Sequence, residues 1–420
     1  MNIYIDRSDR EILRARARHQ QELAHMERNE KLIQMWYDHN ELQGERPMIH
    51  LEMETFSHEI LPGRMHCRGE FARMVEKQIL DNYLNQELFD DDRVTPDYYP
   101  LEYDRWFTLF GIEVRVQHAD TLSGSESLGH HFIPVLQDLE EDYHKLKQSD
   151  FGVDIASTMK KKEVIEEAIG DILPVKLITA CLYSVPTQML VHIMNMQDMM
   201  LAMYDYPELF QEMMGRIAED TIAWYRLMEE KQIFLPTTAG EPLGQGSWCY
   251  NRTLPTDPGR PLVSSDLFGF MDSQETVGIS PEMFEEFIFP CYQKIASQFG
   301  LLSYGCCEPV HPIWDRCLSR LPNLRKVSIS PWCDEEYMGE QLRGSRVIYH
   351  RKPSPNFIGV DRYLDEDAFR RHIRRSLLAA AGCEMEITQR DVYTIHHDIE
   401  KARRYIRIIR EEIAGYWQKG

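Results

Sequence analysis

The sequence predicts an α/β protein built as a (β/α)8 barrel with a helical N-terminal extension. Short apolar segments alternate with longer amphipathic ones through the second half of the chain, and this alternation is typical of parallel β-α-β units. Several such units follow one another and the chain ends on a helix, which favours a TIM barrel over an open sheet. The 420 residues suffice for one large domain with a sizeable core.

The N-terminal region predicts helices followed by the first strand. Residues 6–40 are charged and contain neither Gly nor Pro, so we expect one or two helices there. The pattern changes at Pro47, because residues 47–54 are apolar with acidic residues at their end, as in a first buried strand. We therefore divide the chain into an extension, residues 1–45, and a barrel domain, residues 46–420.

The remaining elements follow in order along the chain. Ser280-Pro281-Glu282 is a strong helix start, and Gly382 is a typical helix end. The predicted strands are residues 111–119, 175–184, 233–240, 262–271, 300–307, 324–332, 345–353 and 383–391. The predicted helices are residues 150–170 (after a short loop), 194–232, 280–300, 311–323, 334–344, 365–382 and 398–417.

Composition excludes several classes of protein. The chain has 68 acidic and 47 basic side chains, a formal net charge of −21, which disfavours binding to nucleic acid or to an anionic membrane. Its N-terminus lacks the apolar core of a signal peptide, and no stretch is long and apolar enough to cross a membrane. Nine cysteines without a framework pattern predict reduced thiols. We therefore expect a cytoplasmic protein.

Reactive side chains concentrate where the predicted strands end. In a barrel of this kind, working residues lie at the carboxyl ends of the strands and in the loops that follow. Residues chosen by this criterion are His50, Glu54, Asp272, Tyr304, Cys306, Cys307, Glu308, His311, Trp332, Lys352 and Asp391. Trp248 is added because it follows a predicted strand in a Gly-rich loop and could stack on a planar substrate.

The segment from Tyr304 to His311 is the most informative. Its two thiols, carboxylate and imidazole are ligands that zinc accepts, which points to Cys306, Cys307 and Glu308 as metal ligands. Neighbouring side chains of a strand face opposite ways, so both cysteines can share one side only if the strand breaks at Gly305. A metal-free polar pocket and cysteines used as small buried residues are the alternatives.

With these residues in place, the chain resembles the uroporphyrinogen decarboxylase superfamily, and within it a divergent corrinoid methyltransferase-like subgroup. The resemblance rests on residues 272–296, an acidic loop followed by a Ser-Pro-Glu-x-Phe helix, and on the Tyr-Gly-Cys-Cys-Glu signature at 304–308. It covers residues 262–420 well and the first half only in outline. The resemblance implies a barrel fold and, in the corrinoid enzymes, a zinc site.

Two departures narrow what the resemblance implies. The decarboxylases carry an Arg-Gln-Ala-Gly-Arg segment after the first strand, whereas residues 46–60 carry acids there, which would repel a polycarboxylate. The methyltransferases hold zinc with a His-x-Cys pair and a cysteine at the end of the last strand. The matching positions here are Tyr304, Cys306 and Asp391, so the zinc set is altered.

The sequence therefore leads us to expect an O-demethylase-like methyltransferase. It would move a methyl group from a small methylated substrate, such as a methoxylated aromatic, to a corrinoid carried by a partner protein, with zinc as a candidate cofactor. Catalytic roles fall to Glu308, His311, Asp272 and Asp391, and substrate binding to His50, Glu54, Trp248, Tyr304, Trp332 and Lys352. The alternatives are a metal-free decarboxylase or lyase of a small carboxylate and a non-catalytic ligand-binding barrel.

Overall fold

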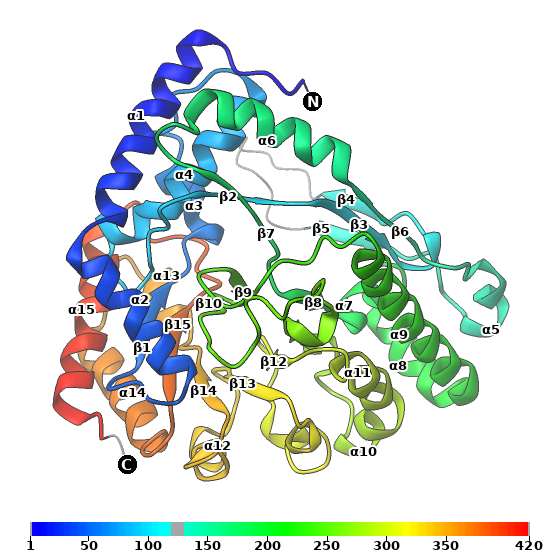
Figure 1. Cartoon of the computed structure of the whole chain (residues 1–420). Coiled ribbons are helices and arrows are strands. Elements are labelled where there is room, and N and C mark those ends of the chain that lie inside the picture. Colours follow the sequence, from blue (N-terminus) through cyan, green and yellow to red (C-terminus); the bar gives the residue numbers. More distant parts are fainter. Residues whose placement is uncertain (1, 119–129, 419–420) are drawn as a thin grey trace.

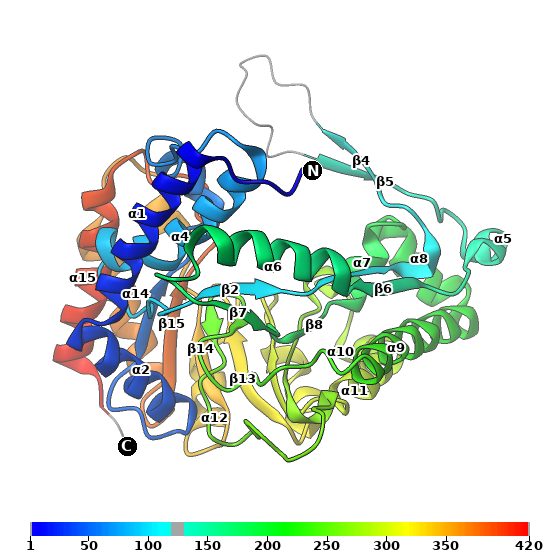
Figure 2. The same ribbon diagram turned by 45° about the horizontal axis from the view of Figure 1, so that its top comes forward.

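The protein is an α/β structure organised on one parallel sheet, as the sequence predicts. The computed structural model describes residues 2–118 and 130–418. Seven strands lie in the order β1-β15-β14-β13-β12-β11-β8, and all six pairings between them are parallel. Figures 1 and 2 show these strands between α14 (Glu366–Ala379) and α15 (Ile399–Tyr416) on one side and α9 (Pro207–Glu230) and α11 (Phe289–Ala296) on the other.

The strands are short, and most of those in the large sheet are buried along their whole length. The large sheet contains β1 (Met48–Leu51), β8 (Leu182–Ser184), β11 (Phe268–Met271), β12 (Leu301–Tyr304), β13 (Leu324–Ile329), β14 (Ile348–Arg351) and β15 (Met385–Gln389). Four two-stranded sheets contain β2 (Tyr99–Glu102) with β7 (Val175–Ile178), β3 (Asp104–Thr108) with β6 (Asp150–Asp154), β4 (Arg115–His118) with β5 (His130–Ile133), and β9 (Pro242–Gly244) with β10 (Ser247–Trp248).

Helices connect the strands and cover the sheet. The N-terminal ones are α1 (Arg7–Ala24), α2 (Glu27–Asn40), α3 (Ser57–Ile60), α4 (Glu70–Leu88), α5 (Leu139–Asp142) and α6 (Ile155–Ile169). The later ones, besides those given above, are α7 (Pro186–Val191), α8 (Met196–Asp205), α10 (Pro281–Met283), α12 (Glu335–Leu342) and α13 (Asn356–Gly359). In the described part of the chain, none of the helices combines the length and the apolar character needed to cross a membrane.

The two faces of the sheet have different partners. On the outer face, Arg351 of β14 donates to Ser376 of α14 and to Glu335 of α12, which ties two covering helices to the strand. On the inner face lies the β9-β10 hairpin, whose Ser247 hydroxyl contacts Lys326 of β13 and Glu386 of β15. The hairpin therefore fills the space that the curved sheet leaves inside.

The closed ring expected of a (β/α)8 barrel is not found among the described residues. The sheet ends at β1 and at β8, and β2 pairs in parallel with β7 but not with β1. A strand forms backbone hydrogen bonds with both neighbouring strands only where both lie close enough to bond. Whether the chain divides at residue 45 stays a prediction, although Asn40 at the end of α2 donates to the backbone of Trp248 in the hairpin.

Two predicted elements are wrong, and side-chain hydrogen bonds explain the first. Residues 233–240 form no strand, because side-chain hydroxyl groups take the place of the backbone hydrogen bonds between strands. The Leu235 N–H donates to the Thr179 hydroxyl, and the Phe268 N–H donates to the Thr237 hydroxyl. Residues 311–323 form only two short 3-10 turns instead of a helix. Pro312 and Pro322 fit helix termini, but between them the single α-type backbone bond, from Cys317 N–H to the Ile313 carbonyl, is not continued into an α-helix.

Other predicted elements are confirmed with changed boundaries. Residues 194–232 are helical but divide at Pro207, which begins α9. The helix expected at 280–300 contains a π-helical turn just before Pro290, a residue that lacks the N–H needed for a regular ladder. The strand expected at 111–119 is observed as β4 (Arg115–His118), and residue 119 lies outside the described residues. All nine cysteines are free thiols, as expected.

Candidate active site

Side chains from four of the parallel strands meet at the carboxyl edge of the sheet. Parallel strands bring their carboxyl ends to one edge, so residues far apart in sequence become neighbours there. We name this group the edge cluster and define it as Asp272 after β11, Cys306 and Cys307 after β12, Lys352 after β14, and Arg390 and Asp391 after β15. Five of these six residues were selected from the sequence. Their chemistry depends on how the chain turns at each strand end.

Gly305 brings the two cysteines together. It follows the last residue of β12 with φ of 97°, a conformation that a residue with a side chain adopts only under strain. The strand therefore stops, and the sulfur atoms of Cys306 and Cys307 lie 3.4 Å apart instead of on opposite faces. The break that the sequence required for a paired thiol site is present.

Cys306 is the thiol most easily ionised. The neighbouring S–H of Cys307 lowers the pKa of Cys306 by donating a hydrogen bond, and the positive charges of Lys352 and Arg390 lower it further. One guanidinium nitrogen of Arg390 lies 3.7 Å from the Cys306 sulfur. These contacts favour a thiolate at Cys306.

Cys307 keeps its proton. The thiolate of Cys306 and the carboxylate of Asp391, whose oxygen lies 3.2 Å from the Cys307 sulfur, both raise the pKa of Cys307. Asp391 adopts φ of 58°, a rare conformation for a residue with a side chain. The Cys307 proton thus lies between two acceptors, one from β12 and one from the segment after β15.

Asp272 is a buried carboxyl group without a hydrogen-bond partner. Its side chain is 1% exposed, and neither of its oxygens has a partner among the described residues. Loss of solvation raises the pKa of Asp272 to about 9, and the negative charges of Glu308 and Cys306 contribute in the same direction. Asp272 is therefore protonated at neutral pH and can act as a proton donor.

Glu308 holds the loops in place. Its two oxygens accept the backbone N–H groups of Ser273, at 2.9 Å, and Cys306, at 2.8 Å. The hydroxyl groups of Tyr304 and Ser273 lie 2.6 Å apart in a second bond between the same two strand ends. Glu308 and Tyr304 thus position the two loops that contain Asp272 and Cys306.

Lys352 is a buried ammonium group held by weak contacts. Its Nζ donates to Gln245 of the hairpin at 3.3 Å and to the Gly305 carbonyl at 3.5 Å. Among the described residues it forms no ion pair, and burial lowers the pKa of Lys352. A charge with so few partners is available to an anionic group of a substrate.

Arg390 belongs to the site although the sequence analysis did not select it. Its Nε lies 3.1 Å from a carboxylate oxygen of Glu52, without the alignment of a hydrogen bond, and 3.6 Å from Asp391. Its position at the end of the last strand, next to Asp391, is the signal that could have identified it. Selection by reactive residue type favoured acids and thiols over an arginine.

A cavity of about 570 Å³ opens beside Cys307. Trp332 stands at its rim with 74% of its surface exposed, as expected of a residue at the site entrance. The residues that line it are Met196, Gln274, Glu275, Val277, Cys307, Glu308, Pro309 and Trp332. This cavity gives a small molecule access to the thiol side of the edge cluster.

The remaining selected residues lie apart from the edge cluster. His311 accepts the backbone N–H of Asp334, and Glu54 is exposed in a 3-10 turn after β1. His50 Nδ1 lies 2.9 Å from a carboxylate oxygen of the buried Asp91, which lowers the pKa of Asp91 to about 2.

Trp248 lines a second cavity. Its ring packs edge-on against His50 at 5.7 Å, and together with Tyr250 it faces a space of about 700 Å³ beside β2. We name this space the β2 cavity. The structure thus places Trp248 near β2 and α4 and not among the residues of the edge cluster.

The arrangement of these donors does not favour zinc. Both oxygens of Glu308 already accept backbone N–H groups, and Lys352 and Arg390 place positive charge beside Cys306. Within residues 2–118 and 130–418, no group of three or more His, Cys, Asp or Glu side chains is arranged to hold a metal ion. Zinc therefore remains a prediction for metal analysis, and no step proposed below depends on it.

Comparison with known proteins supports the fold. No protein-family model and no curated protein matches the sequence. Among solved structures, the chain is similar to a methyltransferase from Methanosarcina mazei, with 13% sequence identity and a TM-score of 0.50. The match covers 90% of this chain and 98% of that one, so the likeness extends over the whole architecture.

Proposed function

We propose that this protein is a methyltransferase that moves a methyl group from a small methylated substrate to a corrinoid carried by a partner protein. The observation that carries the proposal is the edge cluster, where a protonated acid, Asp272, lies beside Cys306, a thiol whose pKa is lowered by its neighbours, and beside the cations Lys352 and Arg390. The structural likeness to a methyltransferase supports the same class of reaction. A methoxylated aromatic compound is the substrate type we infer.

We also infer that the architecture is a (β/α)8 barrel that is open on one side. Eight segments follow the order expected of barrel strands, namely β1, β2, β7 with β8, β11, β12, β13, β14 and β15. The opening lies between β1 and β2. On this interpretation the edge cluster occupies the end of the barrel where enzymes of this fold bind their substrates.

Asp272 is the proton donor of the proposed reaction. The methyl–oxygen bond of the substrate would break as the methyl group is transferred to the corrinoid of the partner protein, which would supply the nucleophile, and Asp272 would give its proton to the substrate oxygen. The products are the methylated corrinoid, an alcohol or phenol, and an ionised Asp272. A positioned acid makes the oxygen a better leaving group, which is worth about 10²–10⁴-fold in rate.

Cys306 acts through its charge. Burial is the main cause of the raised pKa of Asp272, and the negative charges of Glu308 and Cys306 add to it, so Cys306 helps to keep the acid protonated. It also attracts the ammonium group of Lys352 and the guanidinium group of Arg390, which can hold an anionic group of the substrate. Cys306 is thus a positioning residue for the acid and for both cations.

Methyl transfer to free cob(I)alamin tests the proposal. Under anaerobic conditions the purified protein, a panel of methoxylated aromatic compounds and cob(I)alamin should give methylcobalamin and the demethylated phenol in equal amounts. Asp272→Asn should abolish both products, whereas Glu54→Gln, at an exposed site, should retain them. Metal analysis of the same protein tests the zinc prediction independently.

A decarboxylase or lyase is the second candidate, and Lys352 is the observation that favours it. A buried ammonium group without an ion-pair partner could hold a small carboxylate, and Asp272 could protonate the carbanion that forms when carbon dioxide leaves. Release of carbon dioxide from small carboxylic acids, without methylcobalamin formation, would establish this function. Saturable ligand binding without either reaction would indicate a non-catalytic binding protein.

A further inference from the structure

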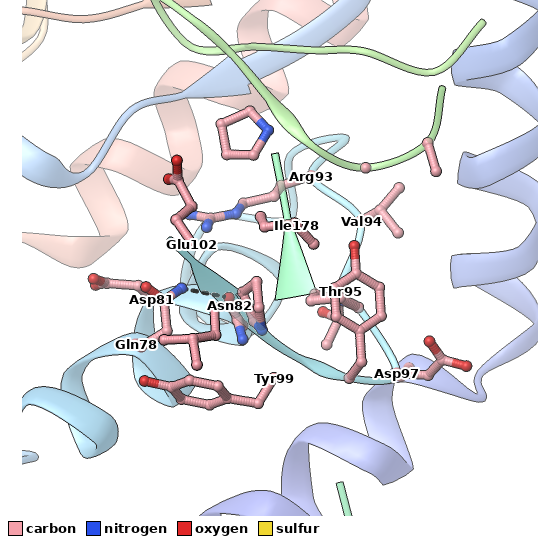
Figure 3. A pocket seen from close by; sticks show the side chains of 18 of the residues that line it. Gln78, Asp81, Asn82, Arg93, Val94, Thr95, Asp97, Tyr99, Glu102 and Ile178 are labelled. Carbon is pink, nitrogen blue, oxygen red and sulfur yellow. Dashed lines mark hydrogen bonds between the residues drawn. The ribbon is translucent and has the colours of Figure 1, made fainter. Parts of the chain in front are cut away.

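The β2 cavity is enclosed by four parts of the chain, none of which contains a residue of the edge cluster. It lies between the end of α2, the side of α4, the loop that leads into β2, and residues 239–250 around the hairpin. Its volume of about 700 Å³ falls in the range of small-molecule sites. Figure 3 shows Arg93, Asn82 and Tyr99 among the residues that line this space.

Two buried N–H groups in the wall of this cavity have no partner. Nε of Arg93 and Nε1 of Trp248 are inaccessible to solvent and lack a hydrogen bond within the described part of the chain. A buried donor without an acceptor is unfavourable, and native proteins contain few of them. The Arg93 guanidinium carbon lies 5.3 Å from the centre of the Trp248 ring, so both donors belong to one place in the wall.

Arg93 is also the cation of this cavity that lacks an ion-pair partner. Its other contact is a 3.2 Å hydrogen bond to the amide oxygen of Asn85. By contrast, Lys77 pairs with Asp81 and Lys161 with Asp104. Among the described residues no carboxylate lies within ion-pair distance of Arg93, and the charges of Asp81, Asp91 and Glu52 act on it only from farther away, so a monoanion could form the ion pair that Arg93 lacks.

Aromatic rings form the wall around these donors. Tyr37 and Tyr250 meet edge-to-face at 5.2 Å, and Tyr98 and Trp248 extend the same surface. Aromatic rings bury a large flat area and prefer to pack against other rings. Two carboxylates of the lining, Asp81 and Asp104, pair with Lys77 and Lys161, and Asp97 is exposed to solvent.

We propose that the β2 cavity is a second ligand site, which binds a small aromatic monocarboxylate. The carboxylate of the ligand accepts hydrogen bonds from Arg93 and from the indole N–H of Trp248, while the aromatic ring of the ligand packs against the tyrosine side chains. The site is separate from the edge cluster, because the hairpin stands between them: Trp248 lines this cavity, whereas Gln245, at the tip of the hairpin, contacts Lys352.

Isothermal titration calorimetry of the full-length protein with 2-naphthoate tests this site. We expect saturable binding with one site per chain. The neutral 2-naphthamide and the non-aromatic cyclohexanecarboxylate should each bind at least tenfold more weakly, because one lacks the charge and the other the ring. Equal binding of the amide, or no saturable binding of 2-naphthoate, would overturn the proposal.

Variants locate the ligand and separate the two sites. Arg93→Met should weaken 2-naphthoate binding at least tenfold, and Trp248→Phe, which keeps the ring but removes the N–H donor, should weaken it several-fold. Cys306→Ser is the matched control at the edge cluster and should bind 2-naphthoate as the parent does. Loss of binding in Cys306→Ser, or unchanged binding in both cavity variants, would contradict a site at β2, whatever the outcome of the methyl-transfer assay.

Discussion

Two groups of buried charges lie close together on the parallel sheet and share β14 and β15, but they differ in how they are paired. The inner charge group, formed by His39, Ser247, Lys326, His350 and Glu386, lies on the inner face of the sheet. One oxygen of Glu386 lies 2.8 Å from Lys326 Nζ and 3.1 Å from both the Ser247 hydroxyl and His39 Nε2. Burial lowers the pKa of His350 to about 3, so this ring stays neutral beside Glu386.

The edge cluster lies one to three residues beyond the ends of β11, β12, β14 and β15, and within the described residues it has no carboxylate shared among several donors. Among the same residues, the inner group leaves one oxygen of Glu386 and Nδ1 of His350 without a hydrogen bond, whereas the edge cluster leaves both oxygens of Asp272 and Nε of Arg390. Asp272 has no hydrogen-bond partner in the described residues, and Lys352 relies on neutral oxygens at 3.3 Å and 3.5 Å. The difference teaches that one sheet holds a charge group on β13, β14 and β15 for stability and leaves another open after β11, β12, β14 and β15. A protein tends to accept such local cost where it binds or reacts.

The largest effect is expected from removing the acid of the edge cluster. Asp272→Asn should lower the rate of methyl transfer by about 100-fold or more, because the substrate oxygen loses its proton donor. The rate of methylcobalamin formation measures this effect. Retention of more than half of the parent rate would show that Asp272 is not the acid.

The same variant should be more stable than the parent at alkaline pH. Since folding raises the pKa of Asp272 from 3.8 to about 9, the folded state binds a proton that the unfolded state releases, and this cost grows as pH rises through that interval. Asp272→Asn removes the cost. We expect a gain in unfolding free energy that grows by about 1.4 kcal/mol for each pH unit above 3.8, so that it reaches several kcal/mol at pH 8 and vanishes toward pH 4, in urea titrations.

Breaking the inner charge group should have the opposite result. Glu386→Gln leaves the buried Lys326 and His39 without their shared carboxylate, so the unfolding free energy should fall by about 3–5 kcal/mol. Urea unfolding followed by circular dichroism measures this loss. A loss below about 1 kcal/mol would contradict a stabilising role for this group.

A smaller effect is expected from changing the charge beside the acid. Cys306→Ser removes the thiolate that raises the pKa of Asp272, so the alkaline limb of the pH–rate profile should move to lower pH. The rate at neutral pH should fall by about tenfold. Cys307→Ser keeps a hydrogen-bond donor next to Cys306 and should leave that limb nearly in place; an equal shift in both variants would argue against the assigned roles.

The smallest effect concerns His39. Its carboxylate partners raise the pKa of His39 above 6.5, so the stability it contributes is complete below pH 6.5 and is lost as pH rises through the raised pKa. His39→Gln should flatten the alkaline decline in unfolding free energy by about 1 kcal/mol. If the unfolding free energy of the variant declined with pH as that of the parent does, the decline would have to come from groups other than His39.

The sequence predicts the strands of the parallel sheet better than it predicts whether the sheet closes into a barrel. Alternation of apolar and amphipathic segments identified β11 to β15, because buried parallel strands are continuous apolar runs. The strand expected at 233–240 failed because threonine hydroxyl groups replace the ladder bonds there. The gap between β1 and β2 depends on tertiary packing around the hairpin, which no local pattern reports.

The candidate site was predictable in its residue types but not in its pairing. Position at strand ends identified Asp272, Cys306 and Lys352, because that criterion follows from parallel topology. It could not show that Glu308 would bind backbone N–H groups, since those bonds depend on how two loops meet. Arg390 was missed because an arginine at a strand end has no specific chemical pattern.

The central claim is that Asp272 holds a proton at neutral pH, and infrared difference spectroscopy of parent and Asp272→Asn protein tests it most directly. A protonated carboxyl group has a carbonyl band distinct from that of a carboxylate. The account predicts that this band is present in the parent at pH 7, is absent in the variant, and disappears with a midpoint of about 9. Absence of the band from the parent at pH 7 would contradict the account.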